Sequence, residues 1–214
     1  MGKRKKERVS EETFLLESAI GEIYAAGAAF GSVEVAESKL RSVLVLKPTL
    51  KERIEALNLL AQVCAQTVRH QEALEHFAAA LAVGPGIAVP LTEGLAGMFE
   101  KQEEWEKAVE VYTRALACCE DASLHNGLGY CLAQAGRLRE AEYHERRATE
   151  LDPNAAVYVN DLGYVLLGQG EFQQARILFE RALGLDPSYE LARENLHVCS
   201  KRASQSGHSP GKAE

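Results

Sequence analysis

The sequence predicts an all-α protein built as an array of paired helices, and three observations support this. Two segments repeat each other without a gap at a spacing of 34 residues. Within each segment the apolar residues recur at intervals of three and four, which places them on one face of a helix. Glycine and proline fall at fixed points where helices are expected to end.

The clearest repeat aligns SLHNGLGYCLAQAGRLREAEYHERRATELDPN with VYVNDLGYVLLGQGEFQQARILFERALGLDPS. The pairs that keep the register are Gly129 with Gly163, Ala141 with Ala175, Ala148 with Ala182, and Pro153 with Pro187. Because four matches share one spacing, we expect two successive copies of the same helical hairpin.

Earlier copies keep these offsets less strictly. The residues that keep the offsets are Leu60-Ala61, Ala73, Phe77, Ala80 and Pro85 in the second copy, and Leu95-Ala96, Ala108, Tyr112 and Ala115 in the third. In the first copy they are Ile23-Tyr24, Ala36, Leu40, Val43 and Pro48. The third copy is one residue short and has Glu120 in place of the proline. We therefore expect a bend or looser packing around residues 84–92 that divides the array in two.

Small residues are expected to form the turns and close contacts of each hairpin. Gly31, Gly136 and Gly170 lie between the paired helices, where glycine adopts positive φ at little cost. Gly129 facing Ala141, and Gly163 facing Ala175, would let the two helices approach closely. The bulky residues expected to fill the wedge near each turn are Trp105, Leu138 and Phe172.

These residues resemble the signature of the tetratricopeptide repeat family over roughly residues 16–189: Leu-Gly, Ala, an aromatic residue, Ala and Pro at fixed offsets. The resemblance implies a right-handed α-solenoid of about five helix-turn-helix repeats. They are expected at residues 17–50, 54–88, 89–121, 122–155 and 156–189, with a capping helix at 190–202. The array (13–202) would then follow a basic arm (1–12) and precede a disordered tail (203–214).

The resemblance also implies a binding groove on the concave face, lined by the first helix of each repeat. The positions that it selects are Asn58, Gln62, Glu93, Asn126, Tyr130, Asn160 and Tyr164. Asn can match the backbone of an extended peptide, and Tyr adds an apolar plate with a polar tip. Two other interpretations stay open: these side chains join neighbouring repeats by hydrogen bonds, or they face water.

One function known in the family is not expected. Repeats that dock heat-shock chaperones hold a C-terminal carboxylate with Lys, Arg and Asn, because an anion needs positive partners. The corresponding places here hold residues such as Ala25 and Asp161. The groove is therefore expected to be too acidic for a carboxylate clamp.

Charge argues against nucleic acid as the main partner. The net charge is -7, although Lys3, Arg4, Lys5, Lys6 and Arg8 crowd the start. The remaining body is strongly acidic, and an acidic body opposes phosphate binding. The basic arm is open to three interpretations: a nuclear-import signal, a tether to an anionic surface, or a solvated arm ahead of a helix capped by Ser10.

No motif predicts catalysis, a metal site, a cofactor or a small-molecule substrate. The six histidines lack the spacing of a zinc site and are expected at the surface. The five cysteines form no CxxC pair, and Cys118 is expected in the core at the place that Leu151 and Leu185 take in later copies. No stretch is apolar enough for a membrane span, so we expect a cytoplasmic, possibly nuclear, protein.

The sequence thus favours a non-enzymatic adaptor that binds a peptide or helical segment of another protein within a larger assembly. Two alternatives remain at this stage. The first is a dedicated chaperone or assembly factor that shields a client chain. The second is a nucleic-acid-associated protein tethered by its basic arm, which the acidic body disfavours.

Overall fold

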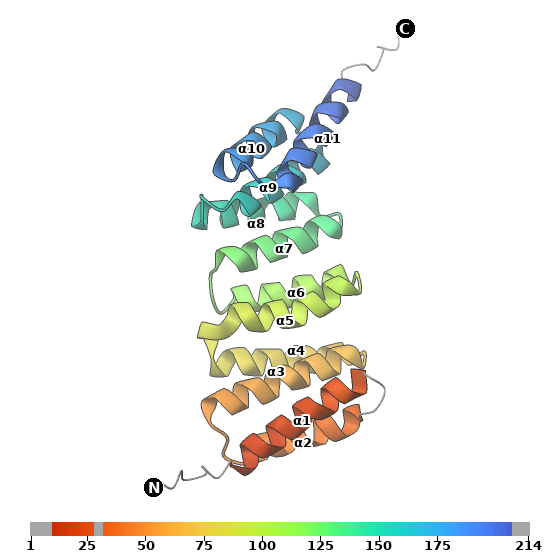
Figure 1. The fold of residues 1–214 in the computed structure, drawn as a ribbon, viewed down its shortest axis with the longest axis vertical. Coiled ribbons are helices and arrows are strands. Elements are labelled where there is room, and N and C mark those ends of the chain that lie inside the picture. Colours follow the sequence, from red (N-terminus) through yellow and green to blue (C-terminus); the bar gives the residue numbers. More distant parts are fainter. Residues whose placement is uncertain (1–9, 28–31, 207–214) are drawn as a thin grey trace, which may run out of the picture. The chain divides into compact units, whose positions relative to one another are not determined.

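The computed structural model describes residues 10–27 and 32–206, except for the side chains of residues 23–27, Pro85 and Ser206. Within these residues the chain forms helices and no strand, which confirms the all-α prediction (Figure 1). Some of the expectations concern parts of the chain outside the described residues. These parts are the basic residues 3–8, Gly31, the side chains of Ile23 and Tyr24, and residues 207–214.

The chain forms two compact units, residues 1–101 (unit 1) and 102–214 (unit 2). Unit 1 contains α1 (Glu11–Gly27), α2 (Val33–Val45), α3 (Leu50–Gln66), α4 (His70–Val83), the 3-10 helix η1 (Pro85–Ile87) and α5 (Ala88–Lys101). Unit 2 contains α6 (Trp105–Leu116), α7 (Ala122–Gln134), α8 (Leu138–Leu151), α9 (Ala156–Gln169), α10 (Phe172–Leu185) and α11 (Glu190–Ser206). The division lies inside the third expected repeat, later than the expected 84–92.

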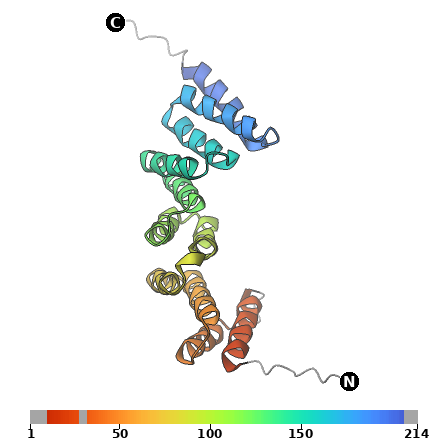
Figure 2. The same ribbon diagram turned by 90° about the vertical axis from the view of Figure 1, so that its left-hand side faces the viewer.

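Within unit 2 each helix packs against the next, from α6 to α11, so that the hairpins α7–α8 and α9–α10 are stacked and α11 covers the last one (Figures 1 and 2). The helix that begins at Glu190 extends to Ser206, four residues beyond the expected end. At the other end of the described chain, α1 begins at Glu11, and Ser10 caps it by accepting a hydrogen bond from the Thr13 amide at 3.1 Å.

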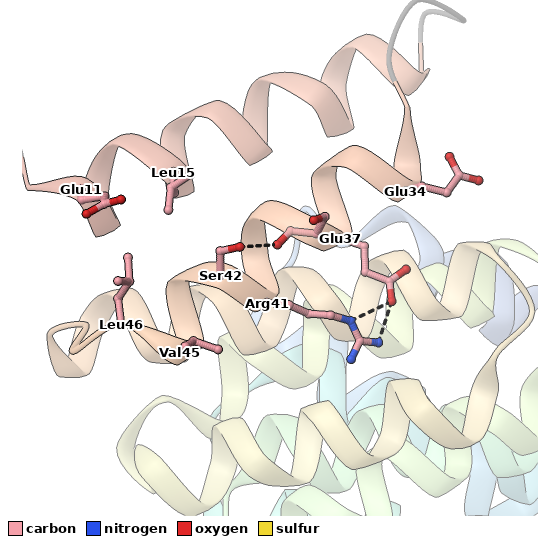
Figure 3. A pocket seen from close by; sticks show the side chains of 9 residues that line it. Glu11, Leu15, Glu34, Glu37, Arg41, Ser42, Val45 and Leu46 are labelled. Carbon is pink, nitrogen blue, oxygen red and sulfur yellow. Dashed lines mark hydrogen bonds and ion pairs between the residues drawn. The ribbon is translucent and has the colours of Figure 1, made fainter.

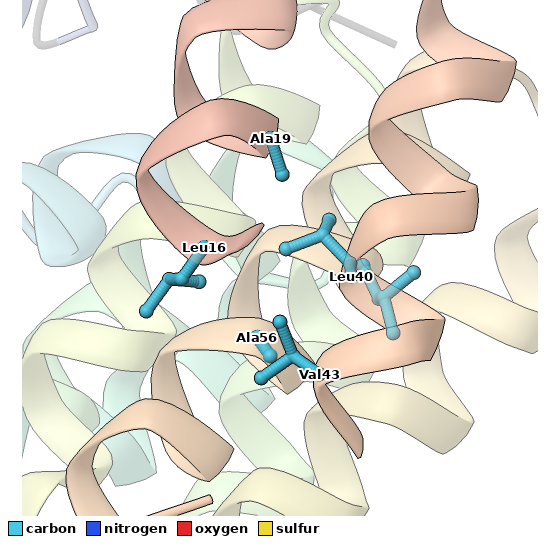
Figure 4. Close-up of a cluster of buried hydrophobic side chains, with 6 residues drawn as sticks. Leu16, Ala19, Leu40, Val43 and Ala56 are labelled. Atoms are coloured by element: carbon cyan, nitrogen blue, oxygen red, sulfur yellow. The ribbon is translucent and has the colours of Figure 1, made fainter. Parts of the chain in front are cut away.

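The repeat signature residues form the core of each unit, as the periodicity predicts. In unit 1, Leu16 and Ala19 of α1 meet Leu40 and Val43 of α2 above Ala56 of α3 (Figure 4). The remaining signature residues with fully buried side chains in the later copies are Leu60, Ala61, Ala73, Phe77, Ala80, Leu95, Ala96, Ala108, Ala115, Ala141, Ala148, Ala175, Phe179 and Ala182.

Four of the described turns between successive helices contain a residue in the left-handed region. Gly136 (φ 79°) and Gly170 (φ 84°) have the positive φ that we predicted. The corresponding turns in unit 1 and at the start of unit 2 place Val68 (φ 62°) and Glu103 (φ 57°) in the same region. A β-branched residue such as Val68 is strained there, because its Cβ crowds the backbone.

One cysteine prediction is wrong. Cys118 is exposed, and Leu151 and Leu185, which occupy the equivalent place, are also 40% and 39% exposed. The position lies at the end of the second helix, because Leu151 and Leu185 are the last residues of α8 and α10 and Cys118 lies two residues beyond α6. Cys64, Cys131 and Cys199 are buried, and all five cysteines are free. Among the described residues, no helix is long and apolar enough to cross a membrane.

Candidate functional site

A buried carboxylic acid replaces an aromatic core residue in the fourth repeat. In the register of the repeats, Glu145 of α8 stands where Phe77, Tyr112 and Phe179 stand in other copies. Its side chain has 0% exposure, like those of the two phenylalanines. Burying a charged group is costly unless partners compensate for the lost water. Glu145 is therefore the position at which this unit departs most clearly from a simple apolar core.

Glycine on the facing helix makes room for this acid. A Cβ added to Gly129 of α7 would lie 2.7 Å from Cδ of Glu145, and one added to Gly163 would lie 2.8 Å from Cε1 of Phe179. We expected these glycines to face Ala141 and Ala175. The nearest side chains are instead those of Glu145 and Phe179, one helical turn later on the same helices. The close approach lets large side chains, not alanines, cover the glycine backbone.

Side-chain amides connect Glu145 to the next helices. Nδ2 of Asn126 (α7) donates to Oε2 of Glu145 at 3.0 Å and to Oδ2 of Asp161 (α9) at 2.9 Å. Nδ2 of Asn160 donates to Oδ1 of Asp161 at 3.0 Å, and Oδ1 of Asn160 accepts from Nδ2 of Asn195 (α11) at 3.0 Å. We call these five residues the polar network. It joins the fourth repeat to the fifth and the fifth to α11.

The two acids of the network are held in an environment that disfavours their charge. Burial, followed by the nearby charge of Asp161, raises the pKa of Glu145 well above its ordinary value of 4.5, against the opposing hydrogen bond from Asn126. Burial also raises the pKa of Asp161. Within the described part of the chain, no Lys, Arg or His side chain forms an ion pair with either acid. The network therefore contains two acids and no neutralising cation.

A hollow of about 230 Å³ opens onto this network. Its lining residues are Tyr130, Ala133, Gln134, Glu145, Asn160, Asp161, Tyr164, Val165, Leu191 and Asn195. Tyr130 and Tyr164 are 43% and 45% exposed, so their rings reach solvent. The ring of Trp105 meets that of Tyr130 edge to face, with centroids 5.9 Å apart, which restrains its position. We call this feature the acidic hollow.

The structure brings four of the seven predicted groove residues together. Tyr130, Asn160 and Tyr164 line the acidic hollow, and Asn126 lies behind it, bonded to both acids. The asparagines join neighbouring repeats, which was one of the alternative interpretations. The network members that the sequence did not suggest as site residues are Glu145, Asp161 and Asn195. A charged residue at the aromatic position of a repeat was the signal that could have identified Glu145.

The other three predicted residues belong to unit 1 and take no part in the acidic hollow. Asn58 of α3 is half-buried, and its Oδ1 has no hydrogen-bond partner in the structure. Nε2 of Gln62 would lie 3.3 Å from a Cβ on Gly94, so this side chain lies against α5. Glu93 of α5 is exposed.

A second, larger hollow of about 760 Å³ lies between α1 and α2 in unit 1 (Figure 3). Two of its charged side chains, Glu37 and Arg41, already have charged partners. Glu37 accepts hydrogen bonds at 2.6 Å from both Arg41 and Arg69, and these, with the Arg69 bond as the largest cause, lower the pKa of Glu37 to about 2. Because these charges are mutually satisfied, this hollow offers less to a charged ligand than the acidic hollow does.

Two histidines stack within the fourth repeat. The rings of His125 and His144 have centroids 5.2 Å apart, and their Nδ1 atoms lie 2.9 Å apart. Burial, followed by the charge of His125, lowers the pKa of His144 to about 4. The expectation of surface histidines holds for His197 but fails for His125, which is 7% exposed. Among the described residues no cluster of three His, Cys, Asp or Glu is placed to hold a metal ion.

Comparisons with known proteins agree with this architecture. A family model of the tetratricopeptide repeat matches residues 28–87 and 99–156. A second model of the same repeat matches residues 156–189. Together these matches cover more than half of the chain. No curated protein matches it significantly.

Several solved structures share the fold. The second TPR domain of the human RPAP3 protein, in complex with an HSP70 peptide, is 24% identical, with a TM-score of 0.52 over 55% of this chain and 98% of that one. YrrB, a TPR protein with an unusual peptide-binding site, is 22% identical, with a TM-score of 0.55 over 86% and 97%. MamA from Desulfovibrio magneticus RS-1 is 18% identical, with a TM-score of 0.53 over 85% and 99%.

Proposed function

Because the chain belongs to the tetratricopeptide repeat family, we propose that it is an adaptor that binds a segment of a partner protein at the acidic hollow of unit 2. The observation that carries this proposal is the pair of tyrosines at the mouth of the hollow. Tyr130 and Tyr164 are almost half exposed although each ring is large and mostly apolar. Aromatic rings of this kind supply much of the binding energy at protein interfaces.

Rigidity of the surrounding surface supports the same function. The asparagines beneath the tyrosines are fixed by hydrogen bonds between repeats, and Trp105 restrains Tyr130. A surface that is already ordered loses little conformational entropy when a partner binds. The walls of the hollow come from α7, α8, α9 and α11, so a segment seated there would contact several successive helices.

The partner that we propose differs in charge from the peptides bound by two solved TPR domains. The second TPR domain of RPAP3 binds the HSP70 peptide SGPTIEEVD, and the first TPR domain of Spaghetti binds the HSP90 peptide SRMEEVD. Both peptides end in Glu-Glu-Val-Asp, so their C-terminal ends are acidic. Such an acidic end needs positive partners, whereas Glu145 and Asp161 supply two acids to the hollow and no cation.

The test uses the full chain and a displayed library of random peptides. Peptides selected on the wild-type protein should lose binding to the double variant Tyr130→Ser, Tyr164→Ser. The asparagines should be left intact in this variant, since replacing them would break bonds between helices. The matched control is Tyr143→Ser with Ile177→Ser, which removes two exposed apolar side chains from α8 and α10.

The two outcomes differ clearly. Binding lost in the tyrosine variant and kept in the control supports a groove at the acidic hollow. If both variants keep the selected peptides, or both lose them, while their circular dichroism matches that of the wild type, the proposed binding surface is wrong.

A further inference from the structure

The acidic hollow contains an acceptor that nothing in the structure uses. Oε1 of Glu145 is buried and has no hydrogen-bond partner, while Oε2 accepts from Asn126. A buried polar atom left without a partner costs about 1–3 kcal/mol. The side chain is part of the lining of the hollow but has no exposed surface, so a ligand would contact this carboxylate once the walls adjust. The unsatisfied oxygen indicates a ligand whether or not the second acid, Asp161, lies nearby.

Asp161 adds a second negative group to the same walls. Two carboxylates that share a desolvated site cannot both ionise cheaply, and each favours a neutral form unless a cation arrives. Asn126 bridges the pair by donating to both, which fixes their positions but supplies no charge. The hollow therefore favours a hydrogen-bond donor that carries a positive charge.

We propose that the acidic hollow receives the side chain of an arginine in the partner's segment, an assignment that rests on the adaptor function proposed above. The guanidinium would donate to Glu145 and Asp161 from one planar group with several N–H donors. Its flat faces can stack on aromatic rings, and Tyr130 and Tyr164 stand at the mouth of the hollow. A lysine ammonium lacks both the planar fork and the stacking faces.

Size and polarity of the hollow agree with this occupant. A volume of about 230 Å³ equals the liquid volume of roughly seven or eight water molecules, which is enough for one long side chain and too little for a folded element. Ala133, Val165 and Leu191 contribute apolar wall. The methylene groups of an arginine can pack along such wall while the charged end reaches the acids.

The experiment compares defined peptides on the full chain. The probes are acetylated and amidated Ala-Ser peptides that carry one central arginine, lysine or citrulline, the last having the shape of arginine without its charge. Affinity is measured by calorimetry. The arginine peptide should bind at least about tenfold more tightly than the citrulline peptide, because it alone neutralises the buried acids.

Two variants locate the effect in the acidic hollow. Glu145→Gln and Asp161→Asn should each weaken the arginine peptide by about tenfold and leave the citrulline peptide unchanged. The matched control is Glu180→Gln, which removes an acid that is about half exposed on α10 and should change neither affinity. Calorimetry in buffers of different ionisation enthalpy should also show proton release when the arginine peptide binds, because the cation favours ionised carboxylates.

Each failure has a distinct meaning. The assignment is overturned if arginine and citrulline peptides bind equally, if lysine binds as tightly as arginine, or if the arginine peptide shows no binding at about 1 mM. It is also overturned if Glu180→Gln weakens binding as much as Glu145→Gln does, since the attraction would then be general. These results leave the adaptor proposal in place, because that proposal is tested separately, by comparing the tyrosine variant with its control on the selected peptides.

Discussion

The substitution Glu145→Gln should stabilise the free protein while removing its proposed ligand. Glutamine keeps the size of glutamate, so the close approach to Gly129 is preserved. It removes the negative charge that burial and Asp161 disfavour. Asn126 keeps an acceptor in the new amide oxygen. The expected gain therefore comes from charge alone and should depend on pH.

The sign and size follow from proton linkage. Below the unfolded pKa of 4.5, Glu145 is protonated in both states and the substitution should change stability little. Above that pH the unfolded chain releases its proton while the folded protein keeps it. The wild type then loses about 1.4 kcal/mol of unfolding free energy per pH unit relative to the variant, until the folded pKa is reached. The difference should therefore grow as pH rises.

Urea unfolding of both full chains, followed by circular dichroism between about pH 5 and about pH 8, measures this difference. Other titrating groups are common to the two proteins and cancel in the comparison. If the two stability curves run parallel across that range, or if the variant is the less stable protein at the higher pH, the buried acid is not strained as we infer.

Three further predictions concern other features. Val68→Gly should raise the unfolding free energy by about 0.5–1 kcal/mol in urea titrations, because glycine relieves the left-handed strain at a side chain that is 74% exposed; a loss of stability would contradict this. The depressed pKa of His144 should lower the unfolding free energy by at most about 3 kcal/mol between pH 6.5 and about 4, because the unfolded chain binds a proton at this histidine that the folded protein does not bind. His144→Gln should flatten this pH dependence in urea titrations. Gly163→Ala should lower the thermal midpoint, since its Cβ would meet the Phe179 ring, whereas Gly184→Ala, with nothing within 4 Å, should maintain or raise it; equal shifts would refute the packing argument.

The repeat architecture could be predicted because it depends on residues that recur at fixed offsets. Alanine and the larger apolar residues reappear at helical spacing, and burial of these residues defines the core. The turn glycines, Gly136 and Gly170, were predictable for the same reason. Val68 and Glu103 were not, because neither residue type signals positive φ and the strain is visible only in the backbone.

The candidate site was predicted only in part. Asn126, Tyr130, Asn160 and Tyr164 came from the resemblance to the family, which implies that the first helix of each repeat lines the concave face. The network also needs Glu145 from a second helix and Asn195 from α11, which meet these residues only through packing between repeats. A single sequence gives the faces of individual helices more readily than the contacts between them.

The contribution of α11 determines how the array can be shortened or grafted. Leu191 and Asn195 supply one wall of the acidic hollow and a donor to Asn160, so no single hairpin holds the whole pocket. A truncation after residue 189 would open the pocket on one side and strip Asn160 of that donor. Transplanting the two last hairpins alone into another solenoid would move the scaffold without its specificity, whereas a transplant of residues 105–206 would carry both.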